Sequence, residues 1–279
     1  MVLPVGDINP THRTPFVTLL LLAANVLVFV LLQPHLGGVF GEDLERMTER
    51  EAAVAFCTEE AFYLRWAVIP EEILDLQPLT EQQVQQIGTR GCEPFREPPG
   101  TKPVILSILT ALFLHAGLGH LLGNMLFLWI FGNNVEDRLG HGRFLLFYAI
   151  GGVAATYAFA LFNRGSLIPL LGASGAIAAV LGAYLLLFPH ARIRVWAPFP
   201  LYLLAPLVGG RIGVWLLFFA IVEVPAFLVL LLWFGLQVLA SAQPIDGGVA
   251  FEAHAAGFIC GMIMVALIDR QRPQQRRAW

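Results

Sequence analysis

The sequence predicts an all-α membrane protein that crosses the bilayer several times, and three observations agree on this fold class. Hydrophobic residues make up 57% of the 279 residues, and charged residues only 13%. The mean hydropathy is +0.70. The apolar residues occur in blocks about as long as a bilayer-spanning helix. The net charge of −3 and the absence of a basic stripe exclude a nucleic-acid-binding protein.

Six apolar segments are the predicted spans of a bundle that occupies residues 15–268. These spans are 15–33, 104–131, 144–162, 171–188, a fifth that ends near Leu239, and 253–268. The first lacks a small-residue cleavage site, so we expect an uncleaved anchor. Around this core we expect a short cytoplasmic N-terminus (1–14), a long outer loop (34–102) and a basic cytoplasmic tail (269–279).

Arginine placement predicts the orientation of these spans. Short loops and tails rich in Lys and Arg stay on the cytoplasmic side of a membrane. Arginines follow the second, fourth and sixth spans, whereas residues 163–169 carry only Arg164 and residues 241–252 carry no Lys or Arg. We therefore expect both termini in the cytoplasm and the long loop outside. The arginines that set this orientation are Arg138, Arg143, Arg192, Arg194, Arg270, Arg272, Arg276 and Arg277.

The apolar stretch from residue 195 to residue 239 is too long for one straight span. Several prolines and the pair Gly209-Gly210 interrupt it. We expect an apolar insertion at about 195–223, with an interfacial or re-entrant segment near 199–210, and then a single crossing. Pro225 either starts the outer part of this crossing or kinks it.

Polar side chains gather in the first turns of the second, fourth and sixth spans, which all descend from the outer face. Ser174 opens the fourth span, His254 opens the sixth, and the second carries His115 and then His120 and Asn124 on one helix face. Such groups are costly inside a bilayer and usually turn toward a water-filled cavity. Their shared depth predicts an active site.

These residue types suit a serine protease. The Ser174 hydroxyl is a weak nucleophile that needs a base within hydrogen-bond reach, and the imidazole of His254 is the candidate. The Ser174 backbone N–H at a helix start, with the side chains of His120 and Asn124, would stabilise a tetrahedral oxyanion. Gly172 and Gly175 would let a substrate backbone approach closely.

Small residues predict how the fourth and sixth spans meet. Gly175 and Gly182 share one face of the fourth span, and Gly257 and Gly261 share one face of the sixth. Glycines let helix backbones approach closely in a membrane. Contact between these two faces would bring Ser174 and His254 together.

Each motif also has a simpler interpretation. Glycine motifs in membrane helices are often only packing motifs, and membrane histidines also bind ions, haem or protons. We predict no metal at His115 and His120, because no Glu follows as in His-Glu-x-x-His and no carboxylate shares their face. Glu136 and Arg138 are interpreted as a pair that caps or tethers a helix on the cytoplasmic side. The coincidence of nucleophile, base and donors at one depth favours the enzyme.

The motifs resemble those of the rhomboid intramembrane serine proteases in order and spacing. They are His115-x4-His120-x3-Asn124, Glu136-x-Arg138, Gly172-x-Ser174-Gly175 with Gly182, and His254-x2-Gly257-x3-Gly261. The resemblance implies a rhomboid helical bundle of the bacterial type, a Ser174–His254 dyad without an acid, and no cofactor. It also implies hydrolysis of transmembrane protein substrates within the lipid bilayer, here expected to be a bacterial inner membrane.

This chain departs from the rhomboid pattern at one position near the dyad. Four residues after the serine, where the best-known members place a Tyr that stacks on the catalytic His, it has Ala178. Other packing must then orient His254.

Two other protein classes stay open as alternatives. A catalytically inactive, client-binding rhomboid relative would commonly lack the Ser or the His. A transporter would predict an inverted repeat, which the two halves do not show.

Two further expectations concern the outer face. We expect Cys57 and Cys92 to form a disulfide, because both lie in the outer loop and that compartment is oxidising, whereas Cys260 lies alone in a span. We expect residues 241–252, rich in Gly and small residues, to be a flexible lid, and the fifth span to give substrates lateral access.

Overall fold

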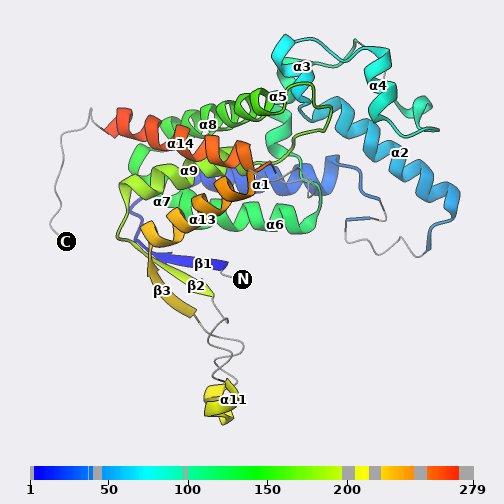
Figure 1. Cartoon of the computed structure of the whole chain (residues 1–279). Helices are drawn as coiled ribbons and strands as arrows, with labels where there is room; N and C mark the ends of the chain where they lie inside the picture. The colour runs from blue at the N-terminus through cyan, green and yellow to red at the C-terminus, as the bar shows by residue number, and fades with distance from the viewer. Residues whose placement is uncertain are drawn as a thin grey trace.

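The protein is a bundle of helices that run side by side, with a separate group of helices at one end (Figure 1). The computed structural model describes residues 3–36, 38–39, 46–96, 98, 100–196, 205–213, 221–241 and 250–269. All the predicted spans contain helix, which confirms a mostly helical membrane fold. The bundle elements are α1 (Phe16–Leu27) with a π-helical turn (Val28–Leu32), α5 (Val104–Thr110) with a 3-10 turn (Ala111–Phe113), α6 (Leu118–Phe127) with a π-helical turn (Leu128–Gly132), α7 (Asn133–Leu139), α8 (His141–Phe162), α9 (Ser174–Leu187), α13 (Ala226–Ser241) and α14 (Phe251–Asp269).

These helices differ in length. Among the described residues, α8 and Phe251–Ile268 of α14 are long and apolar enough to cross a membrane alone. The segments Val104–Phe113 and Leu118–Leu139 qualify as one bent span. The apolar helices Phe16–Leu32, Ser174–Leu187 and Ala226–Ser241 are shorter. The number of six spans therefore stays a prediction.

The predicted second span is not one straight helix, because it bends by 81° between Phe113 and Leu118. At the break, the buried side chain of Gln33 takes the place of helical partners. Its Oε1 accepts a hydrogen bond from the His115 N–H at 3.0 Å, and its Nε2 donates to the His115 carbonyl. His115 thus lies in the break, whereas His120 and Asn124 belong to α6. Local sequence could not predict a break that an amide from another helix stabilises.

A three-stranded antiparallel sheet, absent from the predicted fold, adjoins the bundle (Figure 1). Its strands, in spatial order, are β1 (Leu3–Ile8), β2 (Arg192–Trp196) and β3 (Ile221–Pro225). Ile193 and Val195 of β2 are both 0% exposed and join the core, while Arg192 and Arg194 alternate with them on the exposed face. The N-terminal segment therefore supplies a strand rather than a simple tail.

The predicted apolar insertion begins and ends in this sheet. Within it, the structure describes α11 (Ala205–Val208) and the residues up to 213, and the other residues between β2 and β3 lie outside the described part. Pro225 is the last residue of β3, and α13 begins at the next residue. Pro225 therefore precedes the fifth apolar helix and does not kink it.

Glycines hold α9 and α14 in backbone contact, as the sequence predicted. A Cβ atom added at Gly182 would lie 2.0 Å from the carbonyl oxygen of Phe258, and one at Gly261 would lie 2.0 Å from that of Ala179. No larger side chain fits at such distances. Every residue of α9 from Gly175 to Leu185 is buried, so this helix is the centre of the bundle.

Glu136 ties α7 to the start of α1 and has the expected tethering role. Its fully buried carboxylate accepts hydrogen bonds from the N–H groups of Val17 and Thr18, at 2.8 and 2.7 Å. It also lies 2.6 Å from Nδ1 of His141. A carboxylate at a helix N-terminus satisfies free N–H groups and the helix dipole. Arg138 is half-buried on the same helix.

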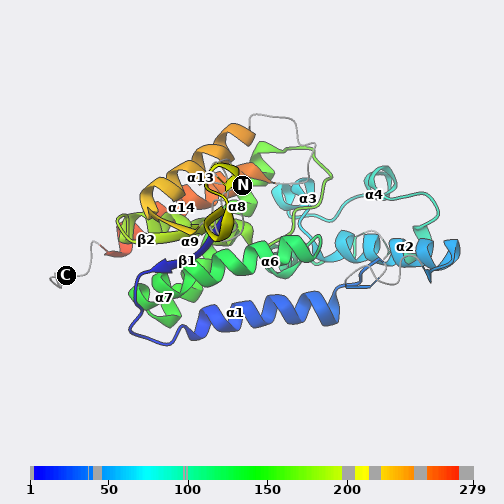
Figure 2. The same cartoon turned by 90° about the horizontal axis from the view of Figure 1, so that it is seen from below.

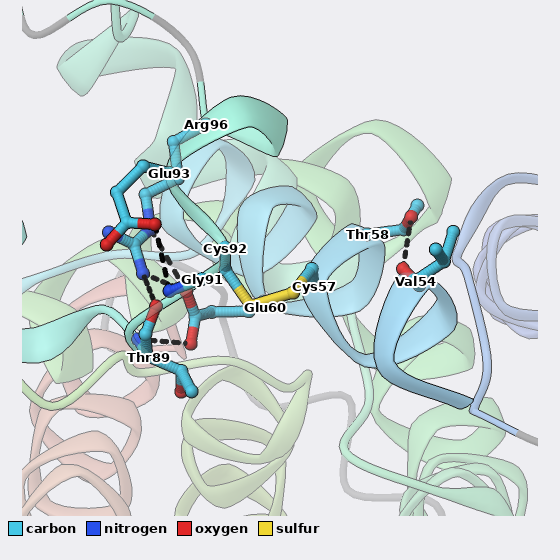
Figure 3. The surroundings of a disulfide bond; sticks show 9 residues. All are labelled: Val54, Cys57, Thr58, Glu60, Thr89, Gly91, Cys92, Glu93 and Arg96. Carbon is cyan, nitrogen blue, oxygen red and sulfur yellow. Dashed lines mark hydrogen bonds and ion pairs between the residues drawn. A yellow bond between two sulfur atoms is a disulfide. The ribbon is translucent and has the colours of Figure 1, made fainter. Parts of the chain in front are cut away.

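The segment predicted as the outer loop folds into a helical lobe, which we name the outer lobe after that prediction. It is built from α2 (Glu49–Trp66), α3 (Pro70–Asp75), α4 (Glu81–Ile87) and a 3-10 turn (Glu93–Phe95). A disulfide joins Cys57 of α2 to Cys92, the pair expected from the sequence (Figure 3). Beside it, Glu60 accepts hydrogen bonds from Arg96 at 2.7 Å and from the Thr89 N–H at 2.9 Å. The disulfide and these bonds close the lobe on itself.

Several contacts connect the outer lobe with the bundle, among them a hydrogen bond from Thr110 Oγ1 of α5 to the Trp66 carbonyl at 2.8 Å. Val68 and Leu170 exchange backbone hydrogen bonds of 3.0 and 2.7 Å. Lys102, just before α5, forms an ion pair with the buried Glu72 of α3. The lobe is thereby joined to the segment that leads into α9.

Candidate active site

Ser174 and His254 meet where α9 and α14 begin. Ser174 is the first residue of α9, His254 lies in the first turn of α14, and Ser174 Oγ is 2.8 Å from His254 Nε2. Gly257 permits this approach, because a Cβ atom there would lie 2.3 Å from the carbonyl oxygen of Gly175. The structure therefore places a hydroxyl within hydrogen-bond reach of an imidazole, as the glycine spacing led us to expect.

The other side of the His254 ring faces α13. Its Nδ1 is 2.8 Å from Oε1 of Gln237, and the rings of Trp233 and Phe251 lie 6.1 and 6.4 Å from the imidazole. Gln237 is not among the site residues expected from the sequence. A signal was present, because Gln237 is a polar residue inside the apolar segment 226–241, and polar groups in membrane helices are usually functional.

His120 and Asn124 offer hydrogen-bond donors beside Ser174. Nδ1 of His120 accepts a bond from the Ala116 N–H at 3.4 Å, which leaves Nε2 to carry the ring proton. Asn124 is 8% exposed, and its Nδ2 has no hydrogen-bond partner among the described residues. Buried donors are normally paired. The unpaired Asn124 donor and the neighbouring His120 Nε2–H are suited to a charge that forms only during a reaction.

Gly172 makes room for His120 next to the serine. A Cβ atom at this position would lie 2.9 Å from His120 Nε2 and 3.7 Å from Ser174 Oγ. Its φ angle of +121° is also one that other residues rarely adopt. Its N–H donates to the carbonyl of Ala111 at 2.8 Å, which fixes the loop before α9.

A cavity of about 600 Å³ joins these groups. Its wall contains Ser174, His254, His120 and Asn124, together with side chains of α13 and of residues 168–171. This volume is typical of ligand sites. The four predicted polar side chains therefore face one space.

His115 does not line this cavity. Its side chain is buried behind His120, with ring centroids 5.1 Å apart, and neither ring nitrogen has a hydrogen-bond partner within the described part of the chain. No group of three or more His, Cys, Asp or Glu side chains among the described residues is arranged to hold a metal ion.

The predicted lid and the predicted side access both stay predictions. Residues 242–249, including Gly247-Gly248, lie outside the described residues, so the lid stays a prediction. Helix α13 lies at the opposite edge of the bundle from α1 (Figure 2). Trp233 of α13 and Phe127 of α6 both line the cavity, whereas Phe234 stacks on Phe258 at 4.8 Å.

Comparisons with known proteins agree on one family. The family model "Rhomboid domain" matches residues 103–271. Rhomboid protein 1, mitochondrial, from Saccharomyces cerevisiae is 32% identical over 176 residues, 62% of this chain and 44% of that protein. Presenilin-associated rhomboid-like protein A, mitochondrial, from Danio rerio is 35% identical over 103 residues, 36% of this chain and 27% of that protein.

A bacterial relative shares a shorter stretch. Rhomboid protease GluP from Bacillus subtilis is 46% identical over 78 residues, 28% of this chain and 15% of that protein. The chain therefore spans less than half the length of each of these three relatives.

Proposed function

Because the chain belongs to the rhomboid family, we propose that it is an intramembrane serine endopeptidase, with Ser174 as nucleophile and His254 as base. Its substrates are transmembrane proteins, cleaved in or near their membrane segments. The observation that carries the proposal is the 2.8 Å contact between Ser174 Oγ and His254 Nε2 at the wall of a large cavity. A hydroxyl needs such a neighbouring base to attack an amide at neutral pH.

The reaction proceeds in two halves. His254 Nε2 takes the hydroxyl proton while Ser174 Oγ bonds to the carbonyl carbon of the scissile peptide. His254 then gives that proton to the leaving nitrogen, the C–N bond breaks, and an acyl-enzyme forms. In the second half, water loses a proton to His254 and attacks the ester carbon, and Ser174 Oγ leaves with the proton.

The oxyanion formed in each half lies near three donors. These are the N–H of Ser174, the first residue of α9, where a helix N–H has no intrahelical partner, together with His120 Nε2–H and Asn124 Nδ2. Fixed donors in a largely buried site stabilise developing charge without reorganising water. This arrangement favours the transition state over the neutral substrate.

Substrates reach Ser174 from the lipid through the side between α6 and α13. Phe127 and Trp233 line the cavity on this side. A transmembrane substrate already lies in the bilayer, so lateral access needs no transfer of its apolar segment into water. The lid formed by residues 241–252 would then cover the site from the outer face.

The site faces the oxidising side of the membrane in this proposal. The Cys57–Cys92 disulfide lies in the outer lobe, and disulfides persist in oxidising compartments. The arginine distribution places both termini on the opposite side. We propose the bacterial inner membrane, with the termini in the cytoplasm. Fusions of a topology reporter at residues 90 and 279 would test this orientation. Reporter signals that place both residues on the same side of the membrane would contradict it.

Cleavage of a model substrate in liposomes tests the proposed activity. The substrate carries small helix-breaking residues near its outer membrane boundary, where extended backbone is accessible. We expect the native protein to cleave it, and Ser174→Ala and His254→Ala each to abolish cleavage. His12→Ala, at a histidine away from the cavity, is a matched control and should cleave normally.

The same assay separates the proposal from the client-binding alternative. A folded native protein that binds the substrate without cleaving it would favour an inactive rhomboid relative. Undiminished cleavage by Ser174→Ala would contradict the mechanism.

A further inference from the structure

The side chains of α9 do not by themselves explain how the His254 ring is oriented. Four residues after Ser174, on the next turn of α9, Ala178 presents only a methyl group. That methyl is fully buried, and a Cβ atom at Gly257 would lie 3.3 Å from it. A histidine base needs a defined ring orientation and tautomer. Another element must therefore supply them.

Gln237 of α13 lies where its side chain can orient the His254 ring and fix its tautomer. Its Oε1 lies 2.8 Å from His254 Nδ1, while His254 Nε2 lies 2.8 Å from Ser174 Oγ. The three side chains thus form a chain of hydrogen bonds from α13 through α14 to α9. Gln237 also lines the cavity.

On the premise of the proposed protease function, we propose that Gln237 is a positioning residue that holds the base. Its amide oxygen accepts the Nδ1–H of His254, which fixes the tautomer whose Nε2 lone pair faces Ser174. The same bond persists when Nε2 is protonated during the reaction and supports the resulting imidazolium. No proton moves to Gln237.

The chemistry of an amide suits this place. A carboxylate at residue 237 would carry a charge into a membrane helix at a high desolvation cost, whereas an amide oxygen accepts the same hydrogen bond without a charge. The opposite amide orientation would present an N–H donor to Nδ1. His254 would then carry its proton on Nε2 and could not accept the serine proton.

In this role, α13 takes part in catalysis as well as in the entry of the substrate. Trp233 lies 5.9 Å from Phe258 of α14, and Phe234 stacks on the same ring at 4.8 Å. These contacts pack the segment that carries Gln237 against α14. If α13 swings outward to admit a substrate, the bond to His254 breaks, and the base regains its alignment only when α13 returns.

Two variants test the positioning role through rate and pH dependence. Gln237→Leu keeps a similar side-chain size without the acceptor, and we expect kcat to fall about tenfold to a hundredfold, the range seen when hydrogen bonds that orient metal-ligating histidines are removed. Gln237→Glu places a carboxylate beside the imidazole and favours its protonated form. The acid limb of the kcat/KM profile should then move to higher pH, because the base stays protonated over a wider range. Leu236→Ala, at a lipid-exposed neighbour, is the control and should match the native protein.

A native rate and pH profile in Gln237→Leu would overturn the inference. Nitrogen-15 NMR of the native protein, labelled at histidine, gives a second readout that needs no Gln237 variant. The His254 signals, identified by their loss in His254→Ala, should report a proton on Nδ1, and a proton on Nε2 would overturn the inference. A native protein that cleaves no substrate contradicts the proposed function, whereas cleavage that is insensitive to Gln237 contradicts only the positioning role.

Discussion

The two walls of the cavity are built in different ways. On one side, α9 and α14 touch backbone to backbone through Gly182, Gly257 and Gly261, and α9 is almost wholly buried. On the other side, α13 leaves most of its leucines exposed, and Gly235 has no atom within 4 Å of an added Cβ. The first wall fixes the distance between nucleophile and base. The second wall is more loosely packed, and it carries Gln237, the residue that we propose orients the base.

The two kinds of packing suit two different needs, the fixed geometry of the dyad and the entry of the substrate. A dyad needs atoms held within a few tenths of an ångström, which close packing provides. A membrane substrate needs an opening, which a loosely packed helix provides. The outer lobe belongs with the fixed wall, because Val68 pairs with Leu170 just before Gly172.

Glycine substitutions on the two walls should give the largest contrast. Gly261→Val would force side-chain atoms against the Ala179 backbone, so we expect α14 to shift, cleavage to be lost, and stability to fall by about 1–3 kcal/mol or more. Gly235→Ala should be tolerated, and helix propensity even favours it by up to about 1 kcal/mol. Cleavage rates and thermal unfolding measure both. Equal losses of cleavage and stability in the two variants would show that the two walls are not packed differently.

Loss of an oxyanion donor should be the next largest effect. Asn124→Ala and His120→Ala should each lower kcat by about 10²–10³, or roughly 2.7–4 kcal/mol, as for other oxyanion donors. Asn133→Ala, on α7 away from the cavity, is the control. Steady-state kinetics separates turnover from binding. Native turnover in both variants would leave His120 and Asn124 as structural polar residues.

Tethering the loosely packed wall should have a smaller effect that depends on substrate size. A crosslink between cysteines placed at Phe127 and Trp233 would join α6 to α13. We expect cleavage of a transmembrane substrate to slow about tenfold or more, as when a gating motion is blocked. Each single-cysteine variant with the same reagent is the control for the lost side chain. Unchanged cleavage after crosslinking would exclude lateral access at this side.

Removing the disulfide should lower the stability of the outer lobe and leave the Ser174–His254 dyad unchanged. Cys57→Ser with Cys92→Ser removes a link across a sequence separation of 35 residues, and the lobe should lose about 2–4 kcal/mol of stability. Limited proteolysis and thermal unfolding report this loss. Native protein with two freely alkylated loop thiols in cells would show instead that the cysteines do not pair.

The smallest expected effect is a pH dependence within the lobe. Burial raises the pKa of Glu60, but hydrogen bonds from Thr89 and Arg96 outweigh it and hold the pKa below its ordinary value. A lowered folded-state pKa gives stability that is present above the unfolded pKa and is lost as pH falls through the folded pKa. Protease resistance of the lobe should therefore fall in acid, and Glu60→Gln should flatten this dependence. An equal acid response in the variant would assign it to other groups.

The sequence predicted those features that depend on one local pattern. Glycine spacing predicted the α9–α14 contact, and the depth of Ser174, His254, His120 and Asn124 predicted that they share one space. The bend at His115 depends on Gln33, 82 residues away, and the sheet pairs β1 with β2 across most of the chain. Gln237 faces His254 only because of how α13 packs. Such partners become visible only in three dimensions.

Covalent labelling of Ser174 tests the central claim most directly. A fluorophosphonate reacts only with a hydroxyl that a neighbouring base activates. After incubation of the purified native protein in detergent, mass spectrometry of its peptides should find the adduct on Ser174. Labelling should decline as pH falls, because only the neutral imidazole accepts a proton. His254→Ala should remove nearly all of it. Absence of an adduct on a folded native protein, or an adduct that persists undiminished in His254→Ala, would contradict the account.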